Sequence, residues 1–447
     1  KEPASRFLLG RHHPINQDLF LQFFRTGHVV GAVSAAIYWG TPGDNQRSIV
    51  FSGDIGPNAE DSETLPFLRH CMYPGHFDYA VLESTYGGVE RTFDEVSPEG
   101  RRNGLRRWLD RTIESNGVLV IPAFSLGRTQ DIMFDLHWIV AENPERYCDV
   151  SFLLDSPSGS KINDIVLRAL ARTEPTGTGK VRPLWLGKQM FRWFGLDAKN
   201  PAHTEHVIAL CQMVLGQAPI TKATSSCPIN PIGGKWSRIF STVENRNALS
   251  DHGLPKKTVL VVSSGTADGG PAAFWLSRLL CQPTTSVAFP GYCAPSTVGG
   301  KLLSLAEVSI QERAMLSEPL KWQDSNATAV KQSNITAAIG LLSGYSAHAD
   351  QAGLLRWAFN GSRSTTVAGT IFLQHGEDPK REALAKALQS EALRIGQTLR
   401  VASPTPETPW LNLDNGADAV NRQEEEELLR AQILQLQEKL SRIQSCA

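Results

Sequence analysis

The sequence predicts an α/β fold built on a parallel sheet. Apolar runs rich in β-branched residues alternate with helical patterns, and turns containing Gly or Pro join them. Residues 117–143 (GVLVIPAFSLGRTQDIMFDLHWIVAEN) predict a strand, a turn and a helix, and residues 258–280 (TVLVVSSGTADGGPAAFWLSRLL) repeat this order. The chain has 447 residues, of which 41% are hydrophobic and 20% are charged, so it can form one large or two medium globular domains.

Further strands are expected where short apolar runs end in a polar residue, because layered α/β folds place their sites at strand ends. These runs are residues 48–54, 78–85, 151–157 and 370–378, and residues 28–37 are a further expected strand because they are rich in β-branched and small residues. The last run is followed by the helical pattern PKREALAKALQSEALRI. Residues 173–235 are rich in Gly, Pro and Thr, which predicts an irregular insertion or a loop-rich lobe.

The C-terminal part predicts a linker and then a helix. Residues 402–418 have the Pro and polar content of a linker. Residues 421–444 favour a helix whose apolar positions step by four and three, a heptad seam formed by Leu429, Ile433, Leu436, Leu440 and Ile443. The helix either pairs with a second helix, in a homo- or hetero-oligomer, or docks on its own domain, and the pattern favours neither alternative.

Composition excludes several classes of protein. A net charge of −1 gives no broad electrostatic field for nucleic acid, although a groove can still be locally basic. Seven scattered cysteines without a Cys-x-x-Cys pair are typical of a reducing compartment, so a cytoplasmic protein is expected. No apolar run reaches about 18 residues, so no membrane span is expected.

One run of the chain is strongly basic. Residues 99–111 (EGRRNGLRRWLDR) contain Arg101, Arg102, Arg106, Arg107 and Arg111. A solvated helix face is the favoured interpretation, and a nucleic-acid-binding patch is the alternative.

Five side chains that can ligate metal recur beside small residues and near predicted strand ends. They are His28, Asp54, Glu83, His348 and His375. The stretch LLSGYSAHAD (341–350) sets His348 between two alanines, which leaves room for a ligand to approach. A single histidine in such a place is more often structural, but imidazole and carboxylate groups together are the usual ligands of Zn²⁺.

Seven short motifs together carry a family resemblance. The order TGHVVGA, FSGDIG, LESTYGG, PAFSLGRTQ, SSGTADGGP, GYSAHAD and LQHGED resembles the β-CASP branch of the metallo-β-lactamase superfamily. Members of this branch process RNA or DNA, and they include ribonuclease J-like enzymes and the endonuclease of the polyadenylation complex. The resemblance implies a metallo-β-lactamase αββα sandwich with an inserted parallel α/β domain, the β-CASP domain, and a site in the cleft between them.

The resemblance also implies a role for each of the five residues. His28 would bind the first zinc, Asp54 would bridge both zincs and take part in catalysis, and His375 would bind the second. His348 would protonate the leaving oxygen, and Glu83 would hold that histidine cationic and oriented. A hydroxide activated by the two metals would attack the phosphorus in line.

The substrate implied by the resemblance is single-stranded RNA, because members that act on RNA carry a histidine where His375 stands. Ser264, Gly265 and Ser346 are candidate phosphate contacts beside His348, with the helix N-terminus after Gly265 contributing. A plain strand-to-helix turn is the alternative for residues 263–270. Two other functions stay open: a catalytically inactive scaffold or RNA-binding subunit, and a DNA nuclease of the same fold.

The strongest motif of the family is His-x-His-x-Asp-His, and none of the eleven histidines of this sequence stands in such a motif. His12 and His13 are adjacent without the rest of the motif, and HTEH (203–206) is interpreted as helical surface. The motif lies outside this sequence or on a separate chain, or the protein is a degenerate member, or the sequence is a fragment. With the five residues alone, each zinc site would lack two protein ligands and zinc would bind weakly.

These inferences divide the chain into five segments. The expected segments are an incomplete first part of the lactamase domain (1–87), the β-CASP domain (88–335), the returning lactamase segment (336–400), the linker (401–420) and the amphipathic or coiled-coil helix (421–447).

Overall fold

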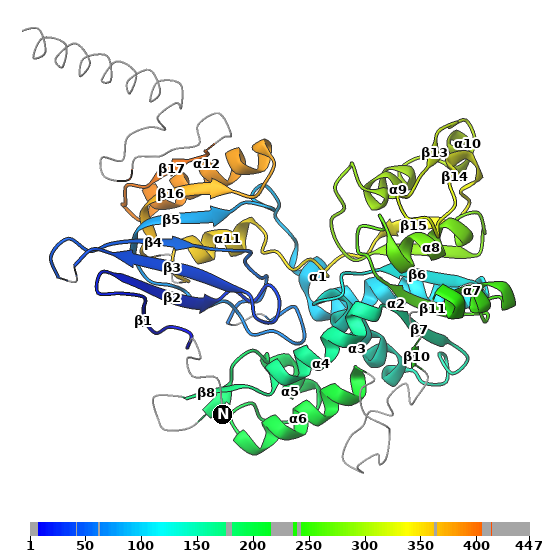
Figure 1. Cartoon of the computed structure of the whole chain (residues 1–447), viewed down its shortest axis with the longest axis horizontal. Coiled ribbons are helices and arrows are strands. Elements are labelled where there is room, and N and C mark those ends of the chain that lie inside the picture. The colour runs from blue at the N-terminus through cyan, green and yellow to red at the C-terminus, as the bar shows by residue number, and fades with distance from the viewer. Residues whose placement is uncertain are drawn as a thin grey trace, which may run out of the picture.

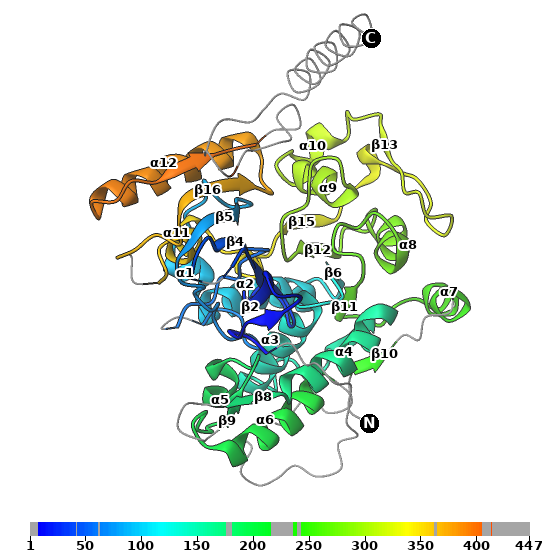
Figure 2. The same cartoon turned by 60° about the vertical axis from the view of Figure 1, so that its left-hand side comes forward.

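The computed structural model describes residues 8–41, 43–60, 63–175, 181–215, 236–238, 243–361, 364–404 and 413. Two large sheets lie side by side in both views of the molecule (Figures 1 and 2). The heptad pattern at 421–444, and the linker except for its first residues and Leu413, lie outside the described residues. The fold is α/β, as the sequence predicts.

The first sheet has seven strands in the order β1-β2-β3-β4-β5-β16-β17. Their bounds are His13–Pro14, Leu19–Arg25, Val33–Trp39, Arg47–Phe51, Phe77–Glu83, Ala368–Gln374 and Arg400–Ala402. Strands β1 to β4 pair antiparallel, whereas β4, β5, β16 and β17 pair parallel. The chain therefore leaves this sheet after β5 and returns beside the same strand at β16, which is the topology of an inserted domain.

Helices α11 (Gln351–Ala358) and α12 (Asp378–Arg394) pack on this first sheet. Trp357 and Leu384 lie in one buried cluster with sheet residues such as Ala80. Asp350 begins α11 by accepting a hydrogen bond at Oδ1 from the amide of Gly353 (3.0 Å). This is the N-cap that its position before QAGLLRWAF indicates.

The second sheet is parallel throughout, in the order β10-β7-β11-β6-β12-β15. In chain order its strands are β6 (Val118–Pro122), β7 (Ser151–Asp155), β10 (Trp236–Arg238), β11 (Thr258–Val262), β12 (Thr285–Phe289) and β15 (Ala338–Leu341). Strand β15 lies beyond the boundary expected at 335. The predicted parallel α/β sheet is confirmed.

Helices cover both faces of the second sheet. They include α2 (Pro98–Glu114), α3 (Arg128–Glu142), α4 (Pro157–Leu170), α8 (Gly270–Leu279) and α9 (Val298–Ala306). Leu119 of β6 belongs to the cluster under α3, and the next residue, Val120, belongs to the cluster under α8. Successive side chains of a strand point to opposite faces, so a strand covered on both faces must be apolar throughout.

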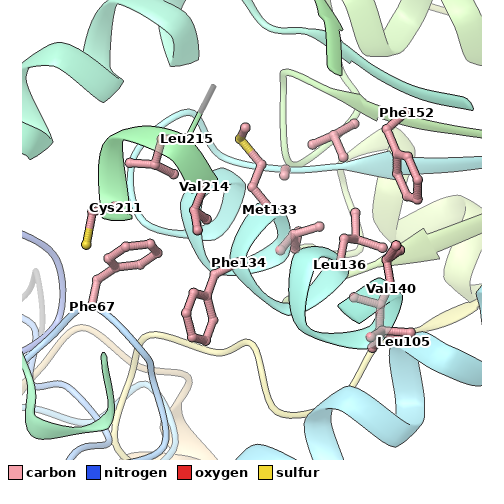
Figure 3. Packing of buried hydrophobic residues seen from close by; sticks show 14 of the residues in the cluster. Phe67, Leu105, Met133, Phe134, Leu136, Val140, Phe152, Cys211, Val214 and Leu215 are labelled. Atoms are coloured by element: carbon pink, nitrogen blue, oxygen red, sulfur yellow. The ribbon is translucent and has the colours of Figure 1, made fainter. Parts of the chain in front are cut away.

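The cluster under α3 is the larger of these two cores (Figure 3). Phe134 and Leu136 of α3 lie in it with Leu105 of α2 and Val214 of α6 (Pro201–Val214). The smaller described elements are α1 (Phe93–Val96), α5 (Lys188–Trp193), α7 (Val243–His252), α10 (Ile310–Arg313), a 3-10 turn (Gln332–Asn334), and the short pairs β8 (Thr173–Pro175) with β9 (Val181–Pro183) and β13 (Pro319–Leu320) with β14 (Val330–Lys331).

The expectation of an irregular lobe at 173–235 is wrong for its described part. That part contains the β8–β9 pair and the helices α5 and α6. Asn200 caps α6 by accepting from the amide of Ala202 (3.1 Å), and Pro201 follows at the first helical position. Helical spacing of buried Val207, Leu210 and Val214 then outweighs the Gly and Pro content nearby. HTEH lies on α6, as interpreted.

The arginine run on α2 differs from the favoured interpretation. Arg107 and Arg111 are exposed, but Arg101 is fully buried and Arg102 is only 9% exposed. Arg101, Leu105 and Leu109 are spaced by four residues, so they share the helix face that packs on the core. The sequence does not reveal a buried partner for this arginine.

Buried His137 predicts a pH-dependent stability. Burial lowers the pKa of His137 to about 4, from its ordinary value of 6.5, so the folded protein holds a neutral imidazole. Below pH 6.5 the unfolded chain binds a proton that the folded chain does not. The contribution of His137 to the free energy of unfolding is therefore fully present above pH 6.5, and it decreases as the pH falls toward 4.

We expect His137→Gln to flatten the decrease in the free energy of unfolding between pH 6.5 and pH 4, measured by urea denaturation. His206→Gln, on the exposed face of α6, is the matched control and should leave the slope unchanged. Equal slopes for wild type and His137→Gln would contradict the neutral, buried state of His137.

Candidate metal centre

Three parallel strands bring three of the candidate residues to one edge of the first sheet. Asp54 follows β4, Glu83 ends β5, and His375 follows β16. In the β5–β16 pair Glu83 is opposite Gln374, so His375 comes directly beside the end of β5. The carboxyl ends of parallel strands meet at the same edge, as in other layered α/β folds.

The other two histidines reach this edge from loops. His28 was expected within a strand at 28–37, but β3 begins at Val33, and His28 lies in the loop between β2 and β3. Gly27 gives this loop its turn: its φ is +73°, and a Cβ there would lie 2.8 Å from the carbonyl oxygen of Arg69. His348 lies between β15 and α11, so it joins the edge from the second sheet.

Asp54 lies between two histidines. Its Oδ1 is 3.1 Å from Nδ1 of His375, and its Oδ2 is 3.7 Å from Nε2 of His28. Among the described residues, two groups place possible ligand atoms within 4.8 Å of one another: His28, Asp54 and His348, and Asp54, Glu83 and His375. A carboxylate shared by two groups of this kind suits a pair of metal ions, and the imidazole and carboxylate donors suit zinc.

His375 occupies an unusual backbone conformation, with φ at +54°. A non-glycine residue in the left-handed region carries strain, and such residues gather at functional sites. The next residue, Gly376, passes so close to β5 that a Cβ would lie 2.5 Å from the carbonyl oxygen of Ser84. The strained turn therefore holds the His375 imidazole at Asp54.

His28 is held as a neutral ligand. Its Nδ1 donates a hydrogen bond to the carbonyl oxygen of Ala347 (3.1 Å), which leaves Nε2 toward Asp54. Burial, and then the neighbouring His348, lower the pKa of His28 to about 4. Metal binding needs an unprotonated imidazole, and this environment supplies one.

His348 and Glu83 form a second, separate unit. Nδ1 of His348 lies 3.2 Å from both carboxylate oxygens of Glu83, which is only 1% exposed. Burial alone would raise the pKa of Glu83, but hydrogen bonds from His348, Thr85 and the amide of Ile55 outweigh burial and lower it. An ionised carboxylate only accepts, so Nδ1 of His348 carries the proton.

A cavity of about 300 Å³ adjoins these residues. Its lining includes His28 and His348 from the centre and Phe124, Arg128 and Tyr292 from the second sheet's side. A second cavity of about 660 Å³ shares Tyr86, Pro290, Gly291, Tyr292 and Ser346 with it. The two cavities together form a cleft between the sheets.

The predicted phosphate contacts are only partly in the cleft. Gly265 and Ser346 line it, whereas Ser264 is not among its lining residues. The Ser264 hydroxyl lies 3.2 Å from that of Thr266. The helix that follows begins with the amide of Gly270 already donating to Asp324 (2.8 Å).

The sequence did not indicate several residues in or beside the cleft. Arg91 donates to the carbonyl oxygen of His348 (3.2 Å), and its guanidinium carbon lies 4.3 Å from the Tyr86 ring centroid. Lys380 Nζ lies 4.8 Å from the ring centroid of Tyr292. Three of the lining residues, Tyr86, Phe124 and Arg128, belong to the family motifs, so those motifs could have indicated them. No local pattern of the sequence indicates Lys380 or Tyr292.

A buried polar network fixes the turn that carries His348. Arg101 donates to both oxygens of Asp135 (2.6 and 3.1 Å), and the hydroxyl of Tyr345 donates to Oδ2 of the same carboxylate (2.6 Å). All three residues are fully buried. Tyr345 is three residues before His348, so helices α2 and α3 of the second sheet hold the turn that reaches the first.

We expect Asp135→Ala to lower the free energy of unfolding by about 3–5 kcal/mol, because it leaves the Arg101 charge buried without a partner. Asp149→Ala is the matched control. Asp149 is exposed and pairs with Lys257 at 3.7 Å, so its loss should cost about 0–1 kcal/mol. Urea denaturation of both variants measures the difference, and equal losses would contradict the buried pair.

No helix in the described part of the chain is long and apolar enough to cross a membrane.

Comparisons with known proteins agree with the fold. Residues 129–302 match the Beta-Casp domain, and residues 334–395 match the Zn-dependent metallo-hydrolase RNA specificity domain. The second match contains His348 and His375 together with the strand and helix between them.

Relatives similar to the chain are named as transcription termination factors or as a ribonuclease. A transcription termination factor FttA of Methanococcus maripaludis is 23% identical over 363 residues, which are 80% of this chain and 45% of the relative. The factor of the same name in Methanothermobacter thermautotrophicus is 24% identical over 404 residues (90% and 50%). Ribonuclease TTHA0252 of Thermus thermophilus is 26% identical over 386 residues (86% and 68%). The chain thus spans about half the length of the termination factors that it matches.

Proposed function

Because the chain belongs to the β-CASP branch of the metallo-β-lactamase superfamily, we propose that it acts as a zinc-dependent ribonuclease on single-stranded RNA. One observation carries the proposal: ligand atoms of His348 and Glu83, which contact each other, lie within 4.8 Å of those of Asp54, beside the cleft that His28 and His348 line. A proton donor and a metal-ligating group at that separation are what phosphodiester hydrolysis needs. The relative named a ribonuclease supports the same reaction class.

The metal would be held by His28, Asp54 and His375. When bound, zinc supplies the Lewis acidity that activates water and stabilises phosphoryl oxygens. Two features of the chain fit it: the neutral imidazole of His28 and the carboxylate of Asp54 with a histidine at each oxygen. Asp54 would therefore be the common ligand of this set, with one histidine at each of its oxygens.

The chain's own residues would manage the proton. Glu83 fixes the ring of His348 by accepting the Nδ1 proton at its two carboxylate oxygens, so that Nε2 is the ring nitrogen left free. His348 would then deliver a proton to the leaving oxygen. Arg91 holds the His348 backbone, and the Tyr345 network holds the turn before it, so the acid is positioned from two sides.

The lining of the cleft suits a single-stranded nucleic acid. Phe124 is 50% exposed and Tyr292 is 46% exposed, and both line the cavity beside His348. Exposed aromatic rings beside cations such as Lys380 suit single strands, whose unpaired bases can stack. An aromatic lining alone does not separate RNA from DNA, so the choice of RNA rests on the family and on the similar ribonuclease.

We expect His348→Ala to lower the rate of RNA cleavage by about 10²–10⁴-fold, the range for loss of a general acid. Its zinc content, measured by elemental analysis, should equal that of the wild type. His252→Ala, at an exposed position on α7, is the control and should cleave normally. Undiminished cleavage by His348→Ala would remove His348 as the acid.

We expect Asp54→Ala to lose zinc and cleavage together, because it removes the only carboxylate shared by both groups of possible ligands in the described chain. Zinc bound per chain in the wild type is the first measurement. No uptake after zinc has been offered would favour the alternative, a scaffold that keeps the cleft without the reaction. Faster cleavage of DNA than of a matched RNA would instead favour the DNA nuclease.

A further inference from the structure

A pocket between α2, α3 and α5 lies apart from the metal cleft and shares no lining residue with it. Its volume is about 390 Å³, and its lining residues are Pro98, Arg102, Trp138, Gln189 and Arg192. We call it the Arg102 pocket. It draws on the arginine run of α2, which the proposed function does not use.

Arg102 is a largely buried cation that forms no direct ion pair in the described part of the chain, although the carboxylates of Asp135 and Glu142 are near enough to act on its charge. The residue is 9% exposed, and its Nη1 is buried without a hydrogen-bond partner. No ion pair joins it to a carboxylate in the described part of the chain, and its guanidinium carbon lies 4.0 Å from the ring centroid of Trp138. A guanidinium stays charged at any physiological pH. An unpaired buried charge is unfavourable, so an anion in the pocket would offset a cost that the fold otherwise bears.

The charges of the lining suit an anion, although Gln189 Oε1 is a buried acceptor without a hydrogen-bond partner among the described residues. Arg192 is exposed and adds a second positive charge, and no acidic residue lines the pocket. The carboxylate of Glu142 near Trp138 is already engaged, by the indole nitrogen of Trp138 (2.7 Å) and by Arg106. Arg102 and Arg192 both line this pocket, and guanidinium groups match the oxygens of a phosphate, which accepts several charge-assisted hydrogen bonds.

We propose that the Arg102 pocket binds a phosphate group, held by Arg102 and Arg192. Two sources share this chemistry: a phosphodiester of an RNA chain whose other part lies in the cleft, and a free phosphate or phosphate monoester. The RNA source rests on the proposed function, whereas binding of free phosphate does not. Failure of the nuclease activity would therefore leave the phosphate measurement interpretable.

The first measurement is the thermal unfolding temperature in phosphate and in chloride at equal ionic strength. Binding to the folded state alone stabilises it by RT ln(1 + L/Kd), where L is the free phosphate concentration, so this temperature rises with phosphate concentration. Phosphate also stabilises any folded protein by exclusion from its surface, so we expect a larger increase for the wild type than for Arg102→Met, which keeps an apolar stem against Trp138 but removes the charge. Arg107→Met, at an exposed position on the same helix, is the matched control and should keep the wild-type response.

The second measurement is the salt dependence of single-stranded RNA binding, followed by fluorescence anisotropy. If an RNA phosphate occupies the pocket, Arg102→Met should lower the slope of log K against log salt by about 0.7, the value for one phosphate of a single strand. Arg107→Met should leave the slope unchanged. Because Arg102 is buried, Arg192→Gln repeats both measurements at an exposed position where folding is not at risk.

The outcomes separate cleanly. Loss of the phosphate response together with a reduced RNA slope supports an RNA phosphate in the pocket. Loss of the phosphate response with unchanged RNA binding supports a free phosphate or monoester. If phosphate stabilises the wild type no more than it stabilises the two arginine variants, and neither variant changes the RNA slope, the proposal is wrong.

Discussion

The parallel pairing of β5 with β16 is the constraint on which the site depends. The chain leaves the first sheet at Glu83, builds the second sheet, and returns to pair Gln374 with that same glutamate. A slip of one residue in this register would turn every side chain of β16 to the opposite face. Buried Ile371 and Leu373 on β16 oppose such a slip, because they would leave the core under α11 and α12. The hydrophobic core thus fixes the position of His375 relative to Glu83 and Asp54.

The second sheet contributes to the site through one buried carboxylate. Asp135 on α3 binds Arg101 of α2 and Tyr345 of the turn that carries His348. A buried charge pair is a weak source of stability compared with an apolar core, but breaking it is costly, so it strongly resists displacement. Gly344 lies against this network, where a Cβ would lie 2.9 Å from that of Arg101. The turn is therefore held both by hydrogen bonds and by close packing.

The sequence predicts the strand-end residues well because their positions follow from strand periodicity and short motifs. Asp54, Glu83 and His375 follow β4, end β5 and follow β16, as expected. It fails where tertiary contacts decide. The loop at His28 interrupts a run of β-branched and small residues that favours a strand, and the reason is the close approach of Gly27 to the backbone of Arg69. Arg101 is buried because Asp135, 34 positions along the chain, neutralises it, and no local pattern contains that information.

The hydrogen bonds of Glu83 also bear on how metal and proton chemistry would be divided in the cleft. Distance alone permits Glu83 and His348 to be metal ligands, since each lies in one of the two groups near Asp54. An ionised carboxylate offers about four acceptor positions. Glu83 already accepts from the amide of Ile55 (2.6 Å), from the amide of Thr85 (3.3 Å) and, at both oxygens, from His348. Little capacity remains for a metal ion, and ligation would need these bonds to break in a fully buried place. The carboxylate of Asp54 is 40% exposed at its side chain, and its contacts among the described residues are with His28 and His375, so it keeps acceptor positions for a metal ion. The same cleft can therefore keep metal binding at Asp54 and proton transfer at His348 separate, although the two groups lie within a few ångströms of each other.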